Sequence, residues 1–289
     1  MKKLLILSGK GGTGKTTTAA AFIRFANARA FADCDVDAPN LHIVTKEMGK
    51  AETSAYYGSE KAWINKEVCI GCGRCMEHCK FGAIRKENGY CTIDEYACEG
   101  CGVCCYVCPQ KAVEMREDVA GEQTLYQTDR IFSTAKLKMG RGNSGKLVSA
   151  VKLAMMRAGK EMNLAIIDGS PGIGCPVIAS MSGVDLVLIV AEPSLSGLSD
   201  LKRLLKTAAG FQTKAAVCVN KFDISLEQTE EIKSFCLEQG VPFVGCIPYD
   251  TEASKAINEG KSLADVACPA RDALRSVFDQ TMQLLGEPL

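Results

Sequence analysis

The chain has 289 residues, enough for one large α/β domain or for one such domain with a small insert. Lysine plus arginine and aspartate plus glutamate both number 34, so the charge balance indicates neither a nucleic-acid nor a membrane partner. No apolar run is long enough for a signal peptide or a membrane span, and sixteen cysteines then indicate metal binding rather than disulfides, so we expect a cytoplasmic protein.

The first motif is a glycine-rich loop at residues 8–17, with an apolar strand before it and a helix-forming run after it. Its Gly9, Gly14, Lys15 and Thr16 match the phosphate-binding pattern G-x-x-x-x-G-K-[ST]. In such a loop backbone N–H groups surround the phosphates, the lysine contacts the β- and γ-phosphates and the hydroxyl binds Mg²⁺. We therefore predict a nucleotide site formed by Gly9, Gly11, Gly12, Thr13, Gly14, Lys15, Thr16 and Thr17.

The loop has a second lysine, Lys10, directly after its first glycine. This arrangement resembles the deviant Walker A loop of the MinD/ParA/Mrp class and of the nitrogenase iron protein. In that class the extra lysine crosses a dimer interface and contacts the nucleotide of the partner. The resemblance therefore implies a nucleotide-dependent homodimer in which Lys10 acts in trans.

A short apolar strand at about residues 30–32 leads into aspartates at three alternate positions, Asp33, Asp35 and Asp37. Carboxylates at the carboxyl end of a parallel strand lie beside the phosphate loop, where open α/β folds bind their ligands. The resemblance implies that Asp35 orients the attacking water and that Asp33 lies near the Mg²⁺.

Residues 59–118 form a cysteine-rich segment with an internal repeat. A C-x2-C-x2-C-x3-C motif that starts at Cys69 recurs 29 residues later at Cys98. This spacing is the bacterial ferredoxin pattern, in which the fourth cysteine of each motif binds the other cluster, and zinc sites do not require it. The predicted ligands are Cys69, Cys72, Cys75 and Cys108 for one 4Fe–4S cluster, and Cys79, Cys98, Cys101 and Cys104 for the other. Cys91 and Cys105 lie outside the pattern, and we interpret them as bystanders.

After this segment the sequence returns to α/β character, with a strand-like stretch at 123–139 and a helix predicted at 146–160. The next apolar strand, 164–167, ends in Asp168, which is a Walker B pattern that places this carboxylate in the Mg²⁺ shell. Its continuation through Gly172 resembles the D-x-P-P-G switch segment of Mrp-like ATPases.

Further strands are predicted at 184–190, 215–219 and 243–247, and helices at 198–209 and 270–285. The strand at 215–219 leads into Asn220-Lys221-Phe222-Asp223, which matches the guanine-reading motif of GTPases. The two-lysine loop belongs to an ATP-using class in which an asparagine at this strand end contacts adenine, so ATP is favoured and Asn220 is assigned to the base. The last helix has no basic excess on its polar face, so we expect core packing rather than a membrane anchor.

The resemblance covers nearly the whole chain. It implies a mostly parallel α/β P-loop domain of the MinD superfamily at residues 1–58 and 119–289, with a two-cluster ferredoxin domain inserted at 59–118. The preferred function is a homodimeric iron–sulfur ATPase with Mg²⁺ that couples ATP hydrolysis to electron transfer toward a redox partner. Two further functions stay open: an ATP-dependent factor that assembles or carries clusters for a client protein, and a ParA/MinD-type positioning ATPase whose clusters are structural.

Overall fold

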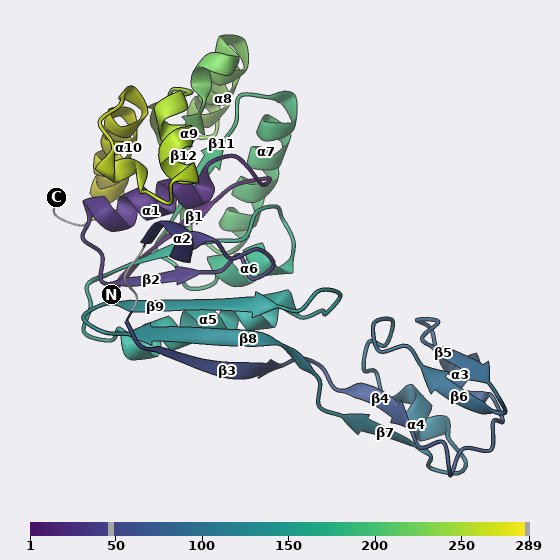
Figure 1. Ribbon diagram of the computed structural model, residues 1–289. Coiled ribbons are helices and arrows are strands. Elements are labelled where there is room, and N and C mark those ends of the chain that lie inside the picture. The colour runs from purple at the N-terminus through teal and green to yellow at the C-terminus, as the bar shows by residue number, and fades with distance from the viewer. Residues whose placement is uncertain (46–48, 287–289) are drawn as a thin grey trace. The chain divides into compact units, whose positions relative to one another are not determined.

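The computed structural model describes residues 1–45 and 49–286, which form two compact units (Figure 1). Unit 1 comprises residues 1–53, 123–136 and 144–289, and unit 2 comprises residues 54–122 and 137–143. Unit 2 contains the whole of the cysteine-rich segment 59–118 and extends beyond it on both sides. The ranges predicted for the P-loop domain include residues 46–48 and 287–289, which lie outside the described residues.

The chain contains a nine-stranded sheet that lies mainly in unit 1, and its first seven strands, in spatial order, are all parallel. Except for the edge strand at residues 243–247, which is partly exposed, these strands carry apolar runs that are buried on both faces, as parallel strands covered by helices require. The order is β13 (Phe243–Ile247), β12 (Lys214–Asn220), β11 (Leu186–Ala191), β1 (Lys2–Leu7), β10 (Leu164–Asp168), β2 (Ala30–Asp33), β9 (Ile131–Leu137), β8 (Val119–Gln127) and β3 (Ala51–Tyr57). The prediction of a mostly parallel α/β sheet is confirmed.

The strand-like stretch predicted at 123–139 is two strands, β8 and β9, joined by residues 128–130. Their arrows point in opposite directions in Figure 1. A connection of three residues can join only antiparallel neighbours, because a parallel pair needs a crossover of a dozen residues or more. The seven strands from β13 to β9 are therefore parallel, and β8 runs in the opposite direction beside β9.

Helices cover the sheet of unit 1, and their apolar sides form its core with the strands. In α10 the apolar residues of the predicted last helix are buried, and Phe278 packs edge-to-face against Phe22 of α1 at 5.0 Å between ring centroids. Core packing of this helix is thus confirmed. The helices are α1 (Lys15–Phe25), α2 (Leu41–Thr45), α5 (Ser144–Ala158), α6 (Cys175–Met181), α7 (Leu195–Gly210), α8 (Leu226–Glu238), α9 (Thr251–Asn258) and α10 (Pro269–Leu285).

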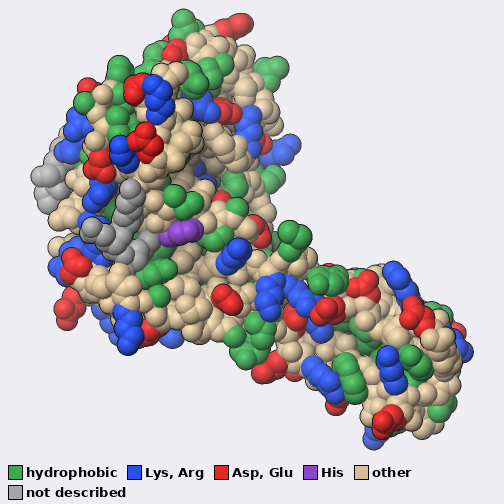
Figure 2. Space-filling model, viewed as in Figure 1, with side chains coloured by type: hydrophobic (Ala, Val, Ile, Leu, Met, Phe, Trp, Pro, Cys, Tyr) green, Lys and Arg blue, Asp and Glu red, His purple; other side chains and the backbone are tan. Residues whose placement is uncertain are grey.

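Two features bear on the expectation that the chain has neither a strongly charged surface nor a membrane span. On the face shown in Figure 2, basic and acidic side chains are interspersed. Within residues 1–45 and 49–286, none of the helices is both long and apolar enough to cross a bilayer.

Unit 2 repeats one small set of elements, in step with its cysteine repeat. Each motif contains a short helix that begins directly after a glycine with positive φ, Gly73 (80°) before α3 and Gly102 (74°) before α4. Two antiparallel pairs complete the unit, and its core combines small apolar side chains with cysteines. The elements are β4 (Lys61–Ile64), α3 (Arg74–His78), β5 (Ile84–Glu87), β6 (Tyr90–Ile93), α4 (Val103–Val107) and β7 (Val113–Arg116); β4 pairs with β7, and β5 with β6.

Candidate functional site

The glycine-rich loop connects β1 to α1 at the carboxyl edge of the parallel sheet, which is the position its sequence context predicts. Two of its glycines are required by close neighbours. A Cβ at Gly9 would lie 2.2 Å from the Cβ of Asp200, and a Cβ at Gly14 would lie 2.4 Å from Nδ2 of Asn220. Gly14 also has φ of 94°, a conformation that favours glycine. The loop therefore packs closely against α7 and the end of β12.

Lys15 and Thr16 of the loop both contact Asp168 at the end of β10. The Lys15 ammonium lies 2.6 Å from Oδ1, and the Thr16 hydroxyl donates to Oδ2 at 2.7 Å. Burial lowers the pKa of Lys15, but the carboxylates of Asp168, Asp35 and Asp33 together outweigh burial, and the net shift is upward. The structure thus joins the predicted Walker A and Walker B residues, and a hydroxyl beside a carboxylate is a suitable donor pair for Mg²⁺.

The aspartates after β2 differ in their surroundings. Asp33 is fully buried, and its carboxylate accepts hydrogen bonds from the backbone N–H groups of Asp35, Asn40 and Leu41, each at 3.0 Å. Burial, reinforced by the Asp168 carboxylate, raises the pKa of Asp33 to about 7, while these N–H groups act in the opposite direction. Asp33 therefore organises the loop that follows β2.

Asp35 has a more open position beside the phosphate loop. Its carboxylate lies 3.8 Å from the Lys15 ammonium, and its side chain is 14 % exposed. Burial raises the pKa of Asp35, and Lys15 counteracts part of that shift. A partly exposed carboxylate at this distance from the phosphate-binding lysine is placed where it could orient a water near a terminal phosphate.

Lys10 is bound within its own chain by residues that the sequence did not single out. Its ammonium lies 3.3 Å from Oε2 of Glu192 and donates to the Ser196 hydroxyl at 3.2 Å. The other carboxylate oxygen of Glu192 lies 3.1 Å from the ammonium of Lys221, which also donates to the Gly12 carbonyl. Glu192 follows a buried apolar strand directly, as Asp168 does, so the strand-then-acid signal that found Asp168 could have found it too.

Asn220 lies next to the phosphate loop and lines a cavity of about 280 Å³. Its side-chain amide donates to the Thr13 carbonyl at 2.8 Å, so part of its role is to support the loop. The cavity is lined by Gly12, Gly14 and Thr17, by the last residue of β13 and the three residues that follow it (247–250), and by one side of α9. It has the position that a base adjoining the phosphate loop would need, and it includes the segment after β13. Asp223 of the guanine-type motif accepts a hydrogen bond from the Tyr249 N–H at 2.8 Å.

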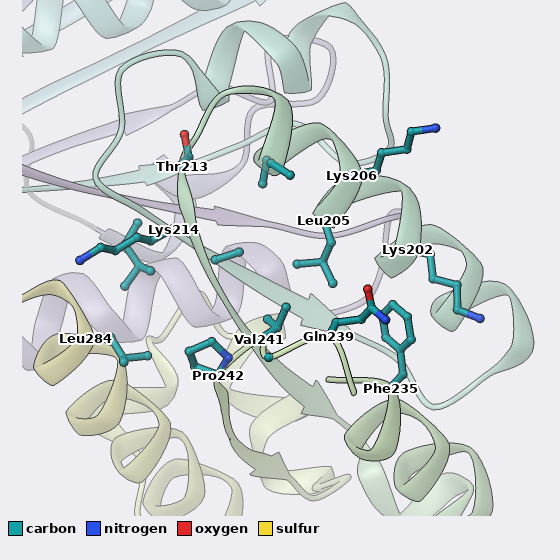
Figure 3. Close-up of a pocket in the computed structure, with 15 residues that line it drawn as sticks. Lys202, Leu205, Lys206, Thr213, Lys214, Phe235, Gln239, Val241, Pro242 and Leu284 are labelled. Carbon is teal, nitrogen blue, oxygen red and sulfur yellow. The ribbon is translucent and has the colours of Figure 1, made fainter. Parts of the chain in front are cut away.

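A larger cavity of unit 1, about 630 Å³, lies at the opposite end of the strands (Figure 3). It is lined by residues at or just before the starts of β11, β12 and β13 together with residues of α7, α8 and α10. Lys202 and Lys206 of α7 extend away from its apolar floor in Figure 3. The predicted site residues are not among those that line this cavity, so its size does not make it the nucleotide site.

In unit 2 the eight pattern cysteines are divided between two cavities, in the grouping that the ferredoxin pattern predicts. The first cavity is lined by Cys69, Cys72, Cys75 and Cys108, and the second by Cys79, Cys98, Cys101 and Cys104. Each cavity therefore combines three cysteines of one motif with the fourth cysteine of the other. One further cysteine, Cys91, which sequence reasoning set aside, also lines the first cavity.

The donor set of each cavity consists of four pattern cysteines, the ligands that iron–sulfur clusters use. Among the described residues, no group of three histidine, cysteine, aspartate or glutamate side chains converges closely enough to hold one metal ion. A 4Fe–4S cube distributes four thiolates over different iron atoms, so its ligands need not meet at one point. Backbone N–H groups also face the sulfurs, with Ala112 donating to Cys108 Sγ at 3.3 Å. Such N–H groups stabilise thiolate ligands.

Comparison with known proteins identifies relatives of both the whole chain and part of it. The sequence model of the CobQ/CobB/MinD/ParA nucleotide-binding domain matches residues 4–263. An uncharacterized protein of Methanocaldococcus jannaschii is 31 % identical over 98 % of this chain and 97 % of its own length. A component of the ion-translocating oxidoreductase complex of Methanosarcina acetivorans is 34 % identical over 80 residues, 28 % of each chain. The cell division ATPase MinD of Pyrococcus furiosus has the same fold, with a TM-score of 0.57 and 14 % identity over 98 % of this chain and 99 % of its own.

Proposed function

Because the chain belongs to the CobQ/CobB/MinD/ParA family of nucleotide-binding proteins, we propose that it is an iron–sulfur ATPase. In this proposal a homodimer binds and hydrolyses ATP with Mg²⁺, and the nucleotide state controls electron transfer through two 4Fe–4S clusters. The partner is a redox protein.

The nucleotide half of the proposal assigns a role to each group that surrounds the loop. The loop N–H groups and Lys15 bind the phosphates, and the Thr16 hydroxyl and the Asp168 carboxylate hold Mg²⁺. Asp35 orients the attacking water, and Lys10 of the partner protomer adds positive charge where the transition state becomes more negative. The contacts of Lys15 and Thr16 with Asp168 support this arrangement.

In the proposed function, the two cysteine sets of unit 2 bind two 4Fe–4S clusters. When bound, such clusters supply one-electron redox chemistry. The protein part of the site consists of eight thiols, the backbone N–H groups that face their sulfurs, and an apolar lining that limits water. The match to a component of an oxidoreductase complex supports a redox role, although it covers only 28 % of the chain.

One observation carries the proposal: two separate cavities, each lined by three cysteines of one motif and the fourth of the other, occur in a chain that also has a complete phosphate loop. A chance set of cysteines would not be divided in this crossed manner. The crossed grouping is what a two-cluster ferredoxin needs.

The test is a redox titration of anaerobically prepared protein without nucleotide, with ADP and with a non-hydrolysable ATP analogue. We expect a cluster potential to shift by about 59 mV between nucleotide states, a tenfold change in a one-electron equilibrium. The Lys15→Ala/Asp168→Asn double variant serves as control, because it removes the phosphate-binding lysine without leaving Asp168 buried and unpaired, so it should bind clusters normally and show no shift. Potentials that do not respond to nucleotide would contradict the coupling. Clusters that leave the protein on addition of ATP and appear in a client would instead favour cluster delivery.

A further inference from the structure

The linings of the two cysteine cavities in unit 2 can be compared position by position, because the repeat relates them by an offset of 29 residues. Three apolar positions of the first cavity have apolar counterparts in the second. These pairs are Ile64 with Ile93, Ala112 with Ala83, and Val113 with Ile84. The two ligand sets therefore share one apolar framework.

The charged positions of the two linings are not equivalent. Arg74, the first residue of α3, lines the first cavity, and its counterpart in the second cavity is Val103. Glu99 lines the second cavity, and its counterpart in the first is Ile70. Among the described residues that line these cavities, Arg74 and Glu99 are the charged ones. The first lining thus has a cation and the second has an anion.

Neither of these two charges is neutralised by a close partner. Both side chains are exposed, and within the described part of the chain neither forms an ion pair. A lysine also lies close to the backbone of each motif. Lys61 Nζ donates to the Cys98 carbonyl, and Lys86 Cε would lie 3.5 Å from a Cβ placed at Gly71. Because each motif has such a lysine, the charge difference between the linings comes from Arg74 and Glu99.

Reduction adds one negative charge to an iron–sulfur cluster, so a nearby cation stabilises the reduced form and a nearby anion destabilises it. We propose that Arg74 and Glu99 tune the two cluster sites in opposite directions and set the potential of the first cluster above that of the second. One electron shared by the two clusters then resides mainly on the first, which is reduced while the second is oxidised. This inference rests on the proposed function in requiring that both clusters bind.

The test is a redox titration of anaerobically reconstituted protein without nucleotide, monitored by electron paramagnetic resonance. In Arg74→Gln the higher of the two midpoints should fall, and in Glu99→Gln the lower midpoint should rise, while the other midpoint changes less in each case. Solvent screens exposed charges, so each shift should be about threefold in equilibrium constant, or about 28 mV. The gap between the native midpoints should also shrink as the salt concentration is raised.

Matched variants separate the effect of charge from that of shape. Arg74→Lys keeps the cation and should keep the native gap between the midpoints. Arg85→Gln and Glu87→Gln remove the same two charges from exposed side chains of β5, and neither residue is among those that line the two cavities. Both of these controls should leave the gap at its native value.

Native midpoints in Arg74→Gln and Glu99→Gln, or a fall of the lower midpoint instead of the higher in Arg74→Gln, would overturn the tuning roles. If either variant fails to assemble its clusters, Val103→Arg places a cation at the equivalent position of the second cavity and should raise the lower midpoint. The result also separates the two proposals. A native protein that binds no iron after reconstitution contradicts the proposed function, whereas native cluster binding with unmoved midpoints in the variants contradicts only the roles of Arg74 and Glu99.

Discussion

Replacement of Glu192 by glutamine should strengthen ATP-dependent dimerisation. In the structure Glu192 binds Lys10 at 3.3 Å within one chain, while the proposed function places Lys10 on the nucleotide of the partner. A lysine that reaches across the interface must leave this carboxylate first. Glutamine keeps the size of the side chain but removes its charge, so Lys10 is released more easily.

The exposure of the pair sets the size of the effect. The Lys10 and Glu192 side chains are 40 % and 22 % exposed, so solvent screens their attraction. A pair of this kind contributes up to about 1 kcal/mol. Because each dimer releases two such lysines, the dissociation constant should fall by up to about 30-fold, equivalent to about 2 kcal/mol.

Sedimentation velocity over a range of protein concentrations, with Mg²⁺ and a non-hydrolysable ATP analogue, measures this constant. The change should disappear in a Lys10→Ala background, where Glu192→Gln releases Lys221 but has no Lys10 to release. Glu230→Gln removes a surface carboxylate paired with Lys233 and should leave the constant unchanged. Equal or weaker dimerisation of Glu192→Gln than of the native protein would refute the reasoning.

Three further predictions concern the phosphate loop and its carboxylates. Gly9→Ala forces a Cβ into α7 and should lower the free energy of unfolding in urea by about 1–3 kcal/mol, whereas Gly11→Ala, with open space around its Cβ, should stay within about 0.5 kcal/mol of native. Lys15→Ala leaves Asp168 buried without its cation and should cost about 3–5 kcal/mol in the same assay, most of it recovered by adding Asp168→Asn. Without added nucleotide or Mg²⁺, protonated Asp33 favours the folded state, so stability should fall as pH rises from about 4 to about 7, and Asp33→Asn should flatten this slope; an unchanged slope would contradict the raised pKa.

Local sequence patterns were sufficient to predict the parts of the molecule whose geometry is set by residues close together in the chain. The strand, glycine loop and helix around Lys15 are adjacent in sequence, so their order alone predicted the loop at the sheet edge. The crossed grouping of eight cysteines also followed from spacing, and the two cavities have that grouping. In each case one short pattern contains most of the required geometry.

Contacts between distant residues could not be predicted in this way. Lys10 and Ser196 are 186 positions apart, and nothing near either residue specifies the other. Cys91 joins the first cavity because pairing of β5 with β6 buries its side chain there, whereas its position in the sequence fits no spacing rule. Both cases depend on how separate elements pack, which local spacing in the sequence does not specify.

The aspartates after β2 show why a motif can identify a site without dividing its roles. The motif itself only places Asp33 and Asp35 at alternate positions at the end of one strand, and it was the family resemblance that implied a water-orienting role for Asp35 and a place near the Mg²⁺ for Asp33. In the structure three backbone N–H groups bind the carboxylate of Asp33, which fixes that side chain as the organiser of its own loop. Asp35 instead is partly exposed and faces Lys15 at 3.8 Å. A general base or water-orienting group needs an oxygen that can still accept a hydrogen bond from water, and hydrogen-bond occupancy therefore supports Asp35 for that role.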